Sequence, residues 1–294
     1  MLRRSIVAVV MFASLTSAAQ PIKPVSRQEY LAYMTTAADN AWNGLAAERE
    51  KWKKSIDVNY VFGYNPPGTD PYLAALCANL YEITKEEVYL DRIKPLLLNY
   101  GRFRDAYPPD YRSKRPEFSA GIPALPNIFT FGKYVHAYQV YQRYRTLSKA
   151  ERDTIESNIG GSADFMIGFQ EWGPMNRALL RAEAVGYAAK ALPGHPRRNV
   201  WEMFSRTVGD DSWNAWEIED ATGYHGVWVY ALLSYASDVR ADESLYRTPI
   251  LHYYFEYMLS LMCPAGNQLP AYGWLPSPTW IRRKPWASPA SLRE

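Results

Sequence analysis

Cysteine is scarce in this chain of 294 residues, which contains only Cys77 and Cys263. No spacing of cysteine and histidine is typical of a structural metal site, so we predict no bound metal and no cofactor. In an exported chain the two cysteines can form a disulfide, whereas in a helical chain each can equally be a buried thiol. The sequence leaves these two possibilities open.

After its first 20 residues the chain also lacks any apolar run of the roughly 20 residues that a membrane-spanning helix needs. The N-terminus is typical of an export signal, with a basic segment at 1–4, an apolar segment at 5–15 and small residues at 16–19. We predict a signal peptide over 1–19 and a periplasmic or secreted mature protein without membrane contact. An uncleaved membrane anchor is the alternative, and the short apolar segment argues against it.

The chain also has no large excess of positive or negative charge, because it contains 33 Lys and Arg and 30 Asp and Glu. Loss of Arg3 and Arg4 with the signal peptide lowers the formal net charge by two, from +3 to +1. Because no basic run remains, the composition excludes a nucleic-acid-binding protein. Aromatic residues, in contrast, make up 15% of the chain, and their rings can either stack on sugars or pack between helices.

The sequence shows no strand-like alternation and no fixed-period repeat, but apolar residues recur at the three- and four-residue steps of amphipathic helices. Pro71 is expected to start a helix behind a capping Asp70, and Gly160 and Gly161 are expected to break a later one. Many helices joined by loops of varied length favour stacked helical hairpins, so we predict an all-α fold, an (α/α) toroid. The predicted helices cover 27–53, 71–81, 87–100, 131–145, 150–169, 174–191, 200–208, 226–239 and 248–262.

The predicted toroid forms one domain over residues 20–273, and residues 274–294 do not fit it. This tail has no helical period and is dense in proline and arginine. A ring of hairpins is expected to continue beyond this point, so we interpret the tail as a truncated or frame-shifted end.

The first informative motif occupies residues 171–183. Pro174 favours the first turn of a helix, which places Asn176 and Arg177 in that turn. Free N–H groups and the helix dipole attract anions there, and Arg181 lies one turn further on the same face as Arg177. The motif therefore predicts a site for a substrate carboxylate.

The second motif, residues 220–228, presents Tyr224 and His225 between two glycines at the start of a helix. Histidine titrates closest to neutral pH and is the usual general base. A third candidate is Tyr272, in a loop bounded by glycine and proline after a helix, where catalytic side chains are often found.

Each of the first two motifs also has a structural interpretation. In the first, Asn176 caps the helix and the arginines form solvated ion pairs with Glu171 and Glu183. In the second, His225 is a buried structural histidine and Tyr224 a packing residue.

Taken together, these side chains match the demands of β-elimination, which cleaves uronic-acid polymers beside a carboxylate. The carboxylate must be neutralised, a base must take the proton at C5, and an acid must protonate the departing O4. We predict that the substrate is an anionic polysaccharide that also contacts Trp172, Trp228 and Glu183. The predicted roles are neutralisation by Asn176 with Arg177 or Arg181, a base at His225 or a tyrosine, and an acid at Tyr272 or Tyr224.

At these residues the chain resembles the (α/α)-toroid polysaccharide lyases of the alginate lyase and heparinase II/III-like superfamily. The resemblance covers about residues 27–273 and rests on three segments, 172–177, 219–225 and 270–273. It implies catalytic roles for Asn176, His225 and Tyr272 and favours alginate as substrate, then glucuronan or a glycosaminoglycan. The chain departs from this group in its short length, and in having Ala271 and Trp274 where acidic residues are expected.

Two other functions remain compatible with the sequence. A glycoside hydrolase on the same toroid needs two carboxylates across a sugar, which can come from Glu171, Glu183, Glu217, Glu219 and Asp220. A non-catalytic glycan-binding protein, or an inactive truncated relic, would use stacking aromatics such as Trp172, Trp213, Trp216 and Trp228.

Overall fold

The computed structural model describes residues 25–54, 66–99, 128–168, 176–214 and 225–260. Within these ranges the chain is helical, apart from short connections, and contains no strand, which confirms the all-α prediction for this part of the protein. None of the helices in these ranges is both long enough and apolar enough to cross a membrane. The predicted signal peptide and the C-terminal tail lie outside the described residues.

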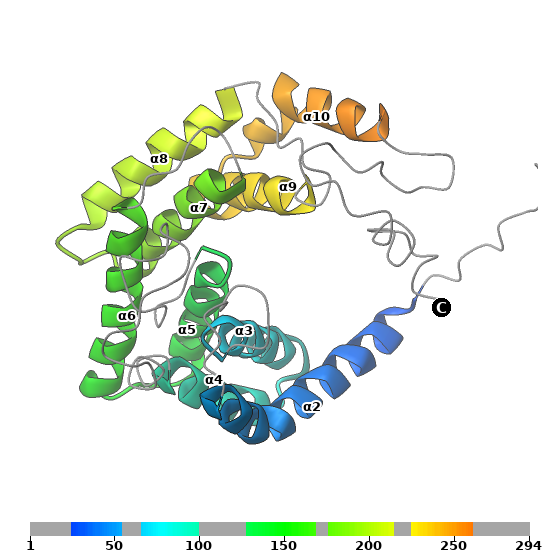
Figure 1. Ribbon diagram of the computed structural model, residues 1–294, viewed down its shortest axis with the longest axis vertical. Helices are drawn as coiled ribbons and strands as arrows, with labels where there is room; N and C mark the ends of the chain where they lie inside the picture. Colours follow the sequence, from blue (N-terminus) through cyan, green and yellow to red (C-terminus); the bar gives the residue numbers. More distant parts are fainter. Residues whose placement is uncertain (1–24, 55–65, 100–127, 169–175, 215–224, 261–294) are drawn as a thin grey trace, which may run out of the picture.

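The helices follow one another along an arc that leads from α2 to α10 (Figure 1). Two short helices between α9 and α10 are not α-helical: η3 is a π-helix and η4 is a 3-10 helix. The elements are α2 (Arg27–Lys54), α3 (Pro66–Thr84), α4 (Glu87–Leu98), α5 (Phe131–Tyr144), α6 (Lys149–Ile167), α7 (Asn176–Ala191), α8 (Arg198–Asn214), α9 (His225–Ser234), η3 (Tyr235–Arg240), η4 (Glu243–Arg247) and α10 (Pro249–Ser260).

The helices form two rows. Helices α3, α5, α7 and α9 contact one another in that order and form the first row, while α4, α6 and α8 form a second row. In Figure 1 the first row lies on the concave side of the arc. Short connections, at 85–86, 145–148 and 192–197, link a helix of the first row to the next helix of the second. Such connections make each pair a helical hairpin, as the sequence predicts.

Helices α3 and α5 of the first row run in the same direction. Near their starts, the Tyr72 hydroxyl donates to the carbonyl oxygen of Phe129 at 3.0 Å. Near their ends, Lys85 Nζ donates to the Tyr144 hydroxyl at 3.2 Å. Because the starts of the two helices are in contact and their ends are also in contact, the pair is parallel. Helix α4, which lies between them in the sequence, runs back in the opposite direction.

Helices α7 and α9 are parallel for the same reason. Glu183 in α7 hydrogen-bonds Ser234 at the end of α9. One turn further, the Tyr187 hydroxyl donates to Asp238 Oδ2 in η3 at 2.6 Å. The N-terminal ends of α7 and α9 therefore lie at the same end of the first row.

Helix α7 is enclosed on almost every side and joins two hydrophobic clusters. Val185 and Ala188 belong to a cluster that extends over α2 to α6 and α8, whereas Leu179 and Ala182 belong to one built with α8, α9 and α10. Full burial of a leucine-sized side chain stabilises a fold by about 1.5–3 kcal/mol. The high alanine content of α7 lets neighbouring helices approach it closely on all faces.

The structure corrects one predicted helix start and one predicted helix break. Helix α3 begins at Pro66 and contains Pro71, and Asp70 is buried in an ion pair with Arg49 of α2 at 2.6 Å. Helix α6 continues through Gly160, where an added Cβ would lie 3.3 Å from His195 Nε2. The glycine therefore permits close packing of α6 against the 192–197 connection and α8, and it does not end the helix.

The buried residue Cys77 is a free thiol in α3. Burial raises the pKa of this thiol to about 12, so it stays protonated at neutral pH. Cys263 lies outside the described residues.

Candidate functional site

Asn176 is the first residue of α7, and its side chain is buried. Arg177 follows it and is partly exposed. The structure thus places an amide and a guanidinium side by side where the described part of α7 begins. Residues 169–175 lie outside the described residues, so the predicted anion site at the first turn stays a prediction.

His225 is the first residue of α9. Because α7 and α9 are parallel, Asn176 and His225 begin their helices at the same end of the first row. The two residues come from motifs separated by about 50 positions, and the fold brings their helices into contact. Gly226, expected in a turn, is already helical.

Arg181 is as deeply buried as Asn176, and its guanidinium is bound within the fold. Its side chain is buried, and both Nε and Nη2 donate to the carbonyl oxygen of Met166 in the last turn of α6. The guanidinium also lies over the Phe204 ring, with its Cζ 5.2 Å from the ring centroid. A cation at a helix C-terminus is bound by free carbonyls and the negative end of the dipole. Arg181 therefore joins α7 to α6.

Trp228 is likewise a core residue in this structure. Its side chain is fully buried, and its ring centroid lies 4.6 Å from that of Tyr254 in α10. A ring enclosed by protein offers no face to a sugar, so the predicted stacking role is not available to Trp228 as it stands. Trp213 is also buried and belongs to the same cluster.

Glu183 is a buried carboxyl group, 5% exposed, on the face of α7 that meets α5 and α9. Burial raises its pKa to about 7 and outweighs the Lys133 charge and the hydrogen bonds with Ser234 and Tyr187, which all lower it. The nearby Asp238 raises it further. Glu183 can therefore gain or lose a proton close to neutral pH.

Lys133 of α5 and Tyr230 of α9 form a pair that sequence reasoning missed. Lys133 Nζ donates to the Tyr230 hydroxyl and lies 4.5 Å from the centroid of its ring. Tyr230 is 47% exposed, and Tyr72 lies close enough for its pKa to respond to both residues. The ammonium therefore contacts both the hydroxyl and the ring of Tyr230. The two residues stand 97 positions apart and belong to no motif, so no local signal points to them.

These groups form one cluster between α5, α7, α9 and η3, which we call the first-row polar cluster. It combines an amine, a carboxyl group that titrates near pH 7, and phenols, so it has the means to transfer protons. The residues of the cluster are Lys133, Glu183, Tyr187, Tyr230 and Asp238.

The remaining predicted site residues lie outside the described residues: Trp172, Tyr224 and Tyr272, together with Glu171, Glu217, Glu219, Asp220 and Trp216. Tyr224 immediately precedes α9 in the chain, and Trp172 lies a few residues before α7. Within the ranges that the structure covers, no group of three or more His, Cys, Asp or Glu side chains is placed to hold a metal ion.

Comparison of the chain with protein families, with curated proteins and with solved structures gives no significant match.

Proposed function

We propose that the chain is a polysaccharide lyase that cleaves a uronic-acid-containing polymer by β-elimination, with alginate as the first candidate substrate. We further propose that the two rows of helices belong to an (α/α) toroid. The parallel pairs in the first row and the hairpin connections to the second support this architecture.

One observation carries the proposal. Asn176 and His225, predicted from separate motifs, lie at the same end of two parallel and contacting helices, with Arg177 beside Asn176. In this proposal a carboxylate at this end meets an amide and a guanidinium, and the neighbouring helix supplies the base.

In this mechanism Asn176 and Arg177 neutralise the uronate carboxylate, which makes the C5 proton more acidic. One buried donor aimed at the developing charge contributes roughly 3–4 kcal/mol by analogy with oxyanion holes. His225 or a tyrosine takes the C5 proton, and Tyr224 or Tyr272 protonates O4. Lys133 makes Tyr230 a further candidate for the tyrosine role.

A glycoside hydrolase is the second candidate, and Glu183 is the observation that favours it. A carboxyl group with a pKa of about 7 remains partly protonated at neutral pH, as a general acid for glycoside cleavage must. Asp238, close enough to influence that pKa, is the available second carboxyl group.

The test is product absorbance at about 235 nm, where the unsaturated uronate made by elimination absorbs and a hydrolysis product does not. The substrates are alginate, polymannuronate, polyguluronate, glucuronan, hyaluronan and heparin. We expect a rise with one polymer that is abolished in Asn176→Ala and in His225→Ala. New reducing ends without absorbance would establish the hydrolase instead, and binding without turnover would indicate a glycan-binding protein.

Matched controls are available in the same chain. Asn214→Ala removes an exposed asparagine from the end of α8, and His252→Ala removes an exposed histidine from α10. Both control variants are expected to retain the full rate. Equal loss of rate in the controls and the site variants would point to a general effect on folding.

A further inference from the structure

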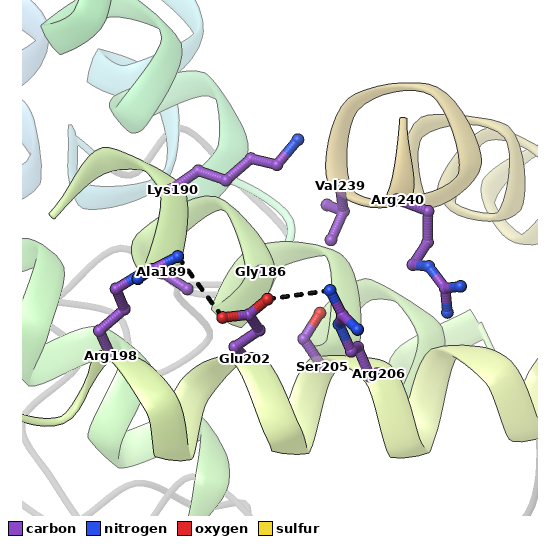
Figure 2. Close-up of a pocket in the computed structure, with 9 residues that line it drawn as sticks. All are labelled: Gly186, Ala189, Lys190, Arg198, Glu202, Ser205, Arg206, Val239 and Arg240. Carbon is purple, nitrogen blue, oxygen red and sulfur yellow. Dashed lines mark hydrogen bonds and ion pairs between the residues drawn. The ribbon is translucent and has the colours of Figure 1, made fainter. Parts of the chain in front are cut away.

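A second concave site lies between α7, α8 and η3, and it adjoins the first-row polar cluster, because Lys190 Nζ donates to the carbonyl oxygen of Asp238. It is a pocket of about 240 Å³ whose lining is rich in cations (Figure 2). The cationic side chains come from all three elements, with Lys190 from α7, Arg198 and Arg206 from α8, and Arg240 from η3. Convergence of cations from separate helices needs an explanation, because they repel one another.

The lining of the pocket contains one acidic residue, Glu202, against these four cations. The Glu202 carboxylate forms ion pairs with Arg206, at 3.0 Å, and with Arg198, at 3.6 Å. Arg240 is paired with Asp210 outside the lining. In Figure 2 the Glu202 carboxylate lies between the two arginines, and the Arg240 guanidinium stands apart from it.

The arginines of α8 are free to change partners. Arg198 is 44% and Arg206 60% exposed, and Glu202 is 37% exposed. Ion pairs at this level of exposure are weak, so an anionic ligand can draw either guanidinium away from Glu202. Arginine also binds carboxylates with two parallel hydrogen bonds, which a single shared Glu202 cannot provide to both.

The floor of the pocket is a close junction of helices. An added Cβ at Gly186 would lie 2.4 Å from Val239 Cγ1 and 2.6 Å from Ser205 Oγ. The Ser205 hydroxyl donates to the carbonyl oxygen of Ala182 at 2.6 Å, which fixes α8 against α7. The pocket is therefore built on a rigid base, and its cations extend from that base.

A neighbouring pocket makes the site longer and adds neutral polar groups. It shares Lys190 with the first pocket and is lined further by Gln139, Gln142 and Arg143 of α5. Amide side chains donate and accept hydrogen bonds, so they suit the hydroxyl groups of a sugar better than a bare inorganic ion. Cations next to amides match a saccharide that carries carboxylates.

The site is distinct from the one at the start of α7. Lys190 follows Asn176 by 14 residues, which corresponds to about 21 Å along the helix axis at 1.5 Å per residue. A ligand in the pocket therefore does not contact Asn176.

We propose that the joined pockets around Lys190 form a second saccharide-binding site, which holds the carboxylates of a uronate oligosaccharide on Arg198, Arg206 and Arg240. The choice of a uronate rests on the proposed function, whereas the preference for an anionic saccharide rests on the lining residues alone. Such a site would retain the polymer on the surface without contributing to its cleavage.

The test measures binding by titration calorimetry in the full chain carrying Asn176→Ala, which prevents turnover. The probes are a mannuronate tetrasaccharide, neutral cellotetraose and inorganic phosphate. In this background we expect the mannuronate oligomer to bind and the neutral oligomer not to bind. Adding Arg198→Gln and Arg206→Gln is expected to lower the affinity of the pocket at least tenfold, or to remove one of two binding events.

Lys149→Gln is the matched control, because Lys149 is an exposed cation in an i,i+4 ion pair with Asp153, as Arg206 is with Glu202. It is expected to leave binding unchanged. An identical isotherm with and without the two arginines would overturn the proposal, and so would binding of phosphate without binding of the oligomer. Turnover in the chain with intact Asn176 is measured separately, so either proposal can fail without the other.

Discussion

The Arg181 guanidinium donates two hydrogen bonds to the carbonyl oxygen of Met166 and so joins the first turns of α7 to the last turn of α6. Arg181→Met keeps much of the apolar stem but leaves that buried carbonyl without these donors. We expect the variant to lose about 2 kcal/mol of stability, the usual cost of removing a charged donor from a buried acceptor. Urea unfolding checks this, with Arg206→Gln as an exposed arginine control that is expected to change stability little. A stability of Arg181→Met equal to that of the control would contradict the structural role.

Glu183 makes stability depend on pH. Its pKa is about 7 in the folded chain and near the ordinary 4.5 in the unfolded one, so the folded state binds more protons between these values. The contribution of Glu183 to the free energy of unfolding is therefore fully present below pH 4.5 and is lost as the pH rises to 7. The change amounts to about 3 kcal/mol.

Glu183→Gln cannot ionise but can still hydrogen-bond Ser234 and Tyr187. We expect it to be more stable than the unmodified chain at pH 8 and to lose stability less steeply from pH 5 to pH 8. Burial also raises the pKa of Asp70, to about 6, but Asp70 is present in both proteins and cancels in their difference. The measurement is urea unfolding at several pH values, and a difference that does not vary with pH would show that Glu183 does not titrate in this range.

Gly209 of α8 lies in close contact with the ring of Tyr235 of η3. An added Cβ there would lie 2.1 Å from Cζ of the Tyr235 ring, which is itself fully buried. Gly209→Ala is therefore expected to destabilise the fold by about 1–3 kcal/mol through overpacking. Gly44→Ala in α2 is the control, since nothing lies within 4 Å of its added Cβ, and it is expected to stabilise by about 0.5–1 kcal/mol. Thermal melting distinguishes the two, and a shift of the same sign in both variants would count against the packing argument.

The Lys133–Tyr230 pair predicts a catalytic effect. If Tyr230 transfers a proton, Tyr230→Phe is expected to lower kcat by roughly 10²–10⁴-fold with little change in KM, because the ring remains and only the hydroxyl is lost. Tyr253→Phe, at a similarly exposed tyrosine of α10, is expected to be neutral. Initial rates on the active polymer provide the measurement, and a Tyr230→Phe rate equal to that of the control would assign the proton transfer to another residue.

Periodicity predicted the helices better than it predicted their interruptions. The sequence predicts helices at 27–53 and 131–145, and the structure has them at Arg27–Lys54 and Phe131–Tyr144. Gly160 does not break α6, and His195, which is distant in sequence, packs against it. The predicted start at Pro71 is wrong because α3 begins at Pro66, and the expected cap Asp70 pairs with the distant Arg49.

The site shows the same limit. The positions of Asn176 and His225 at helix starts follow from local signals, because prolines and glycines mark helix ends. Local signals do not say which side of a helix faces the core, and the structure buries Asn176, Arg181 and Trp228 alike. Lys133 and Tyr230 meet only through the packing of α5 and α9, which no short segment encodes.

Because α7 contributes side chains to both hydrophobic clusters, neither cluster can be separated from the other without exposing half of that helix. The two halves of the arc should therefore denature together, and the calorimetric and van't Hoff enthalpies of melting should agree. Fragments that end before residue 176 or begin after residue 191 would lack α7 and its side chains in the two clusters. They should aggregate or remain unfolded when expressed alone.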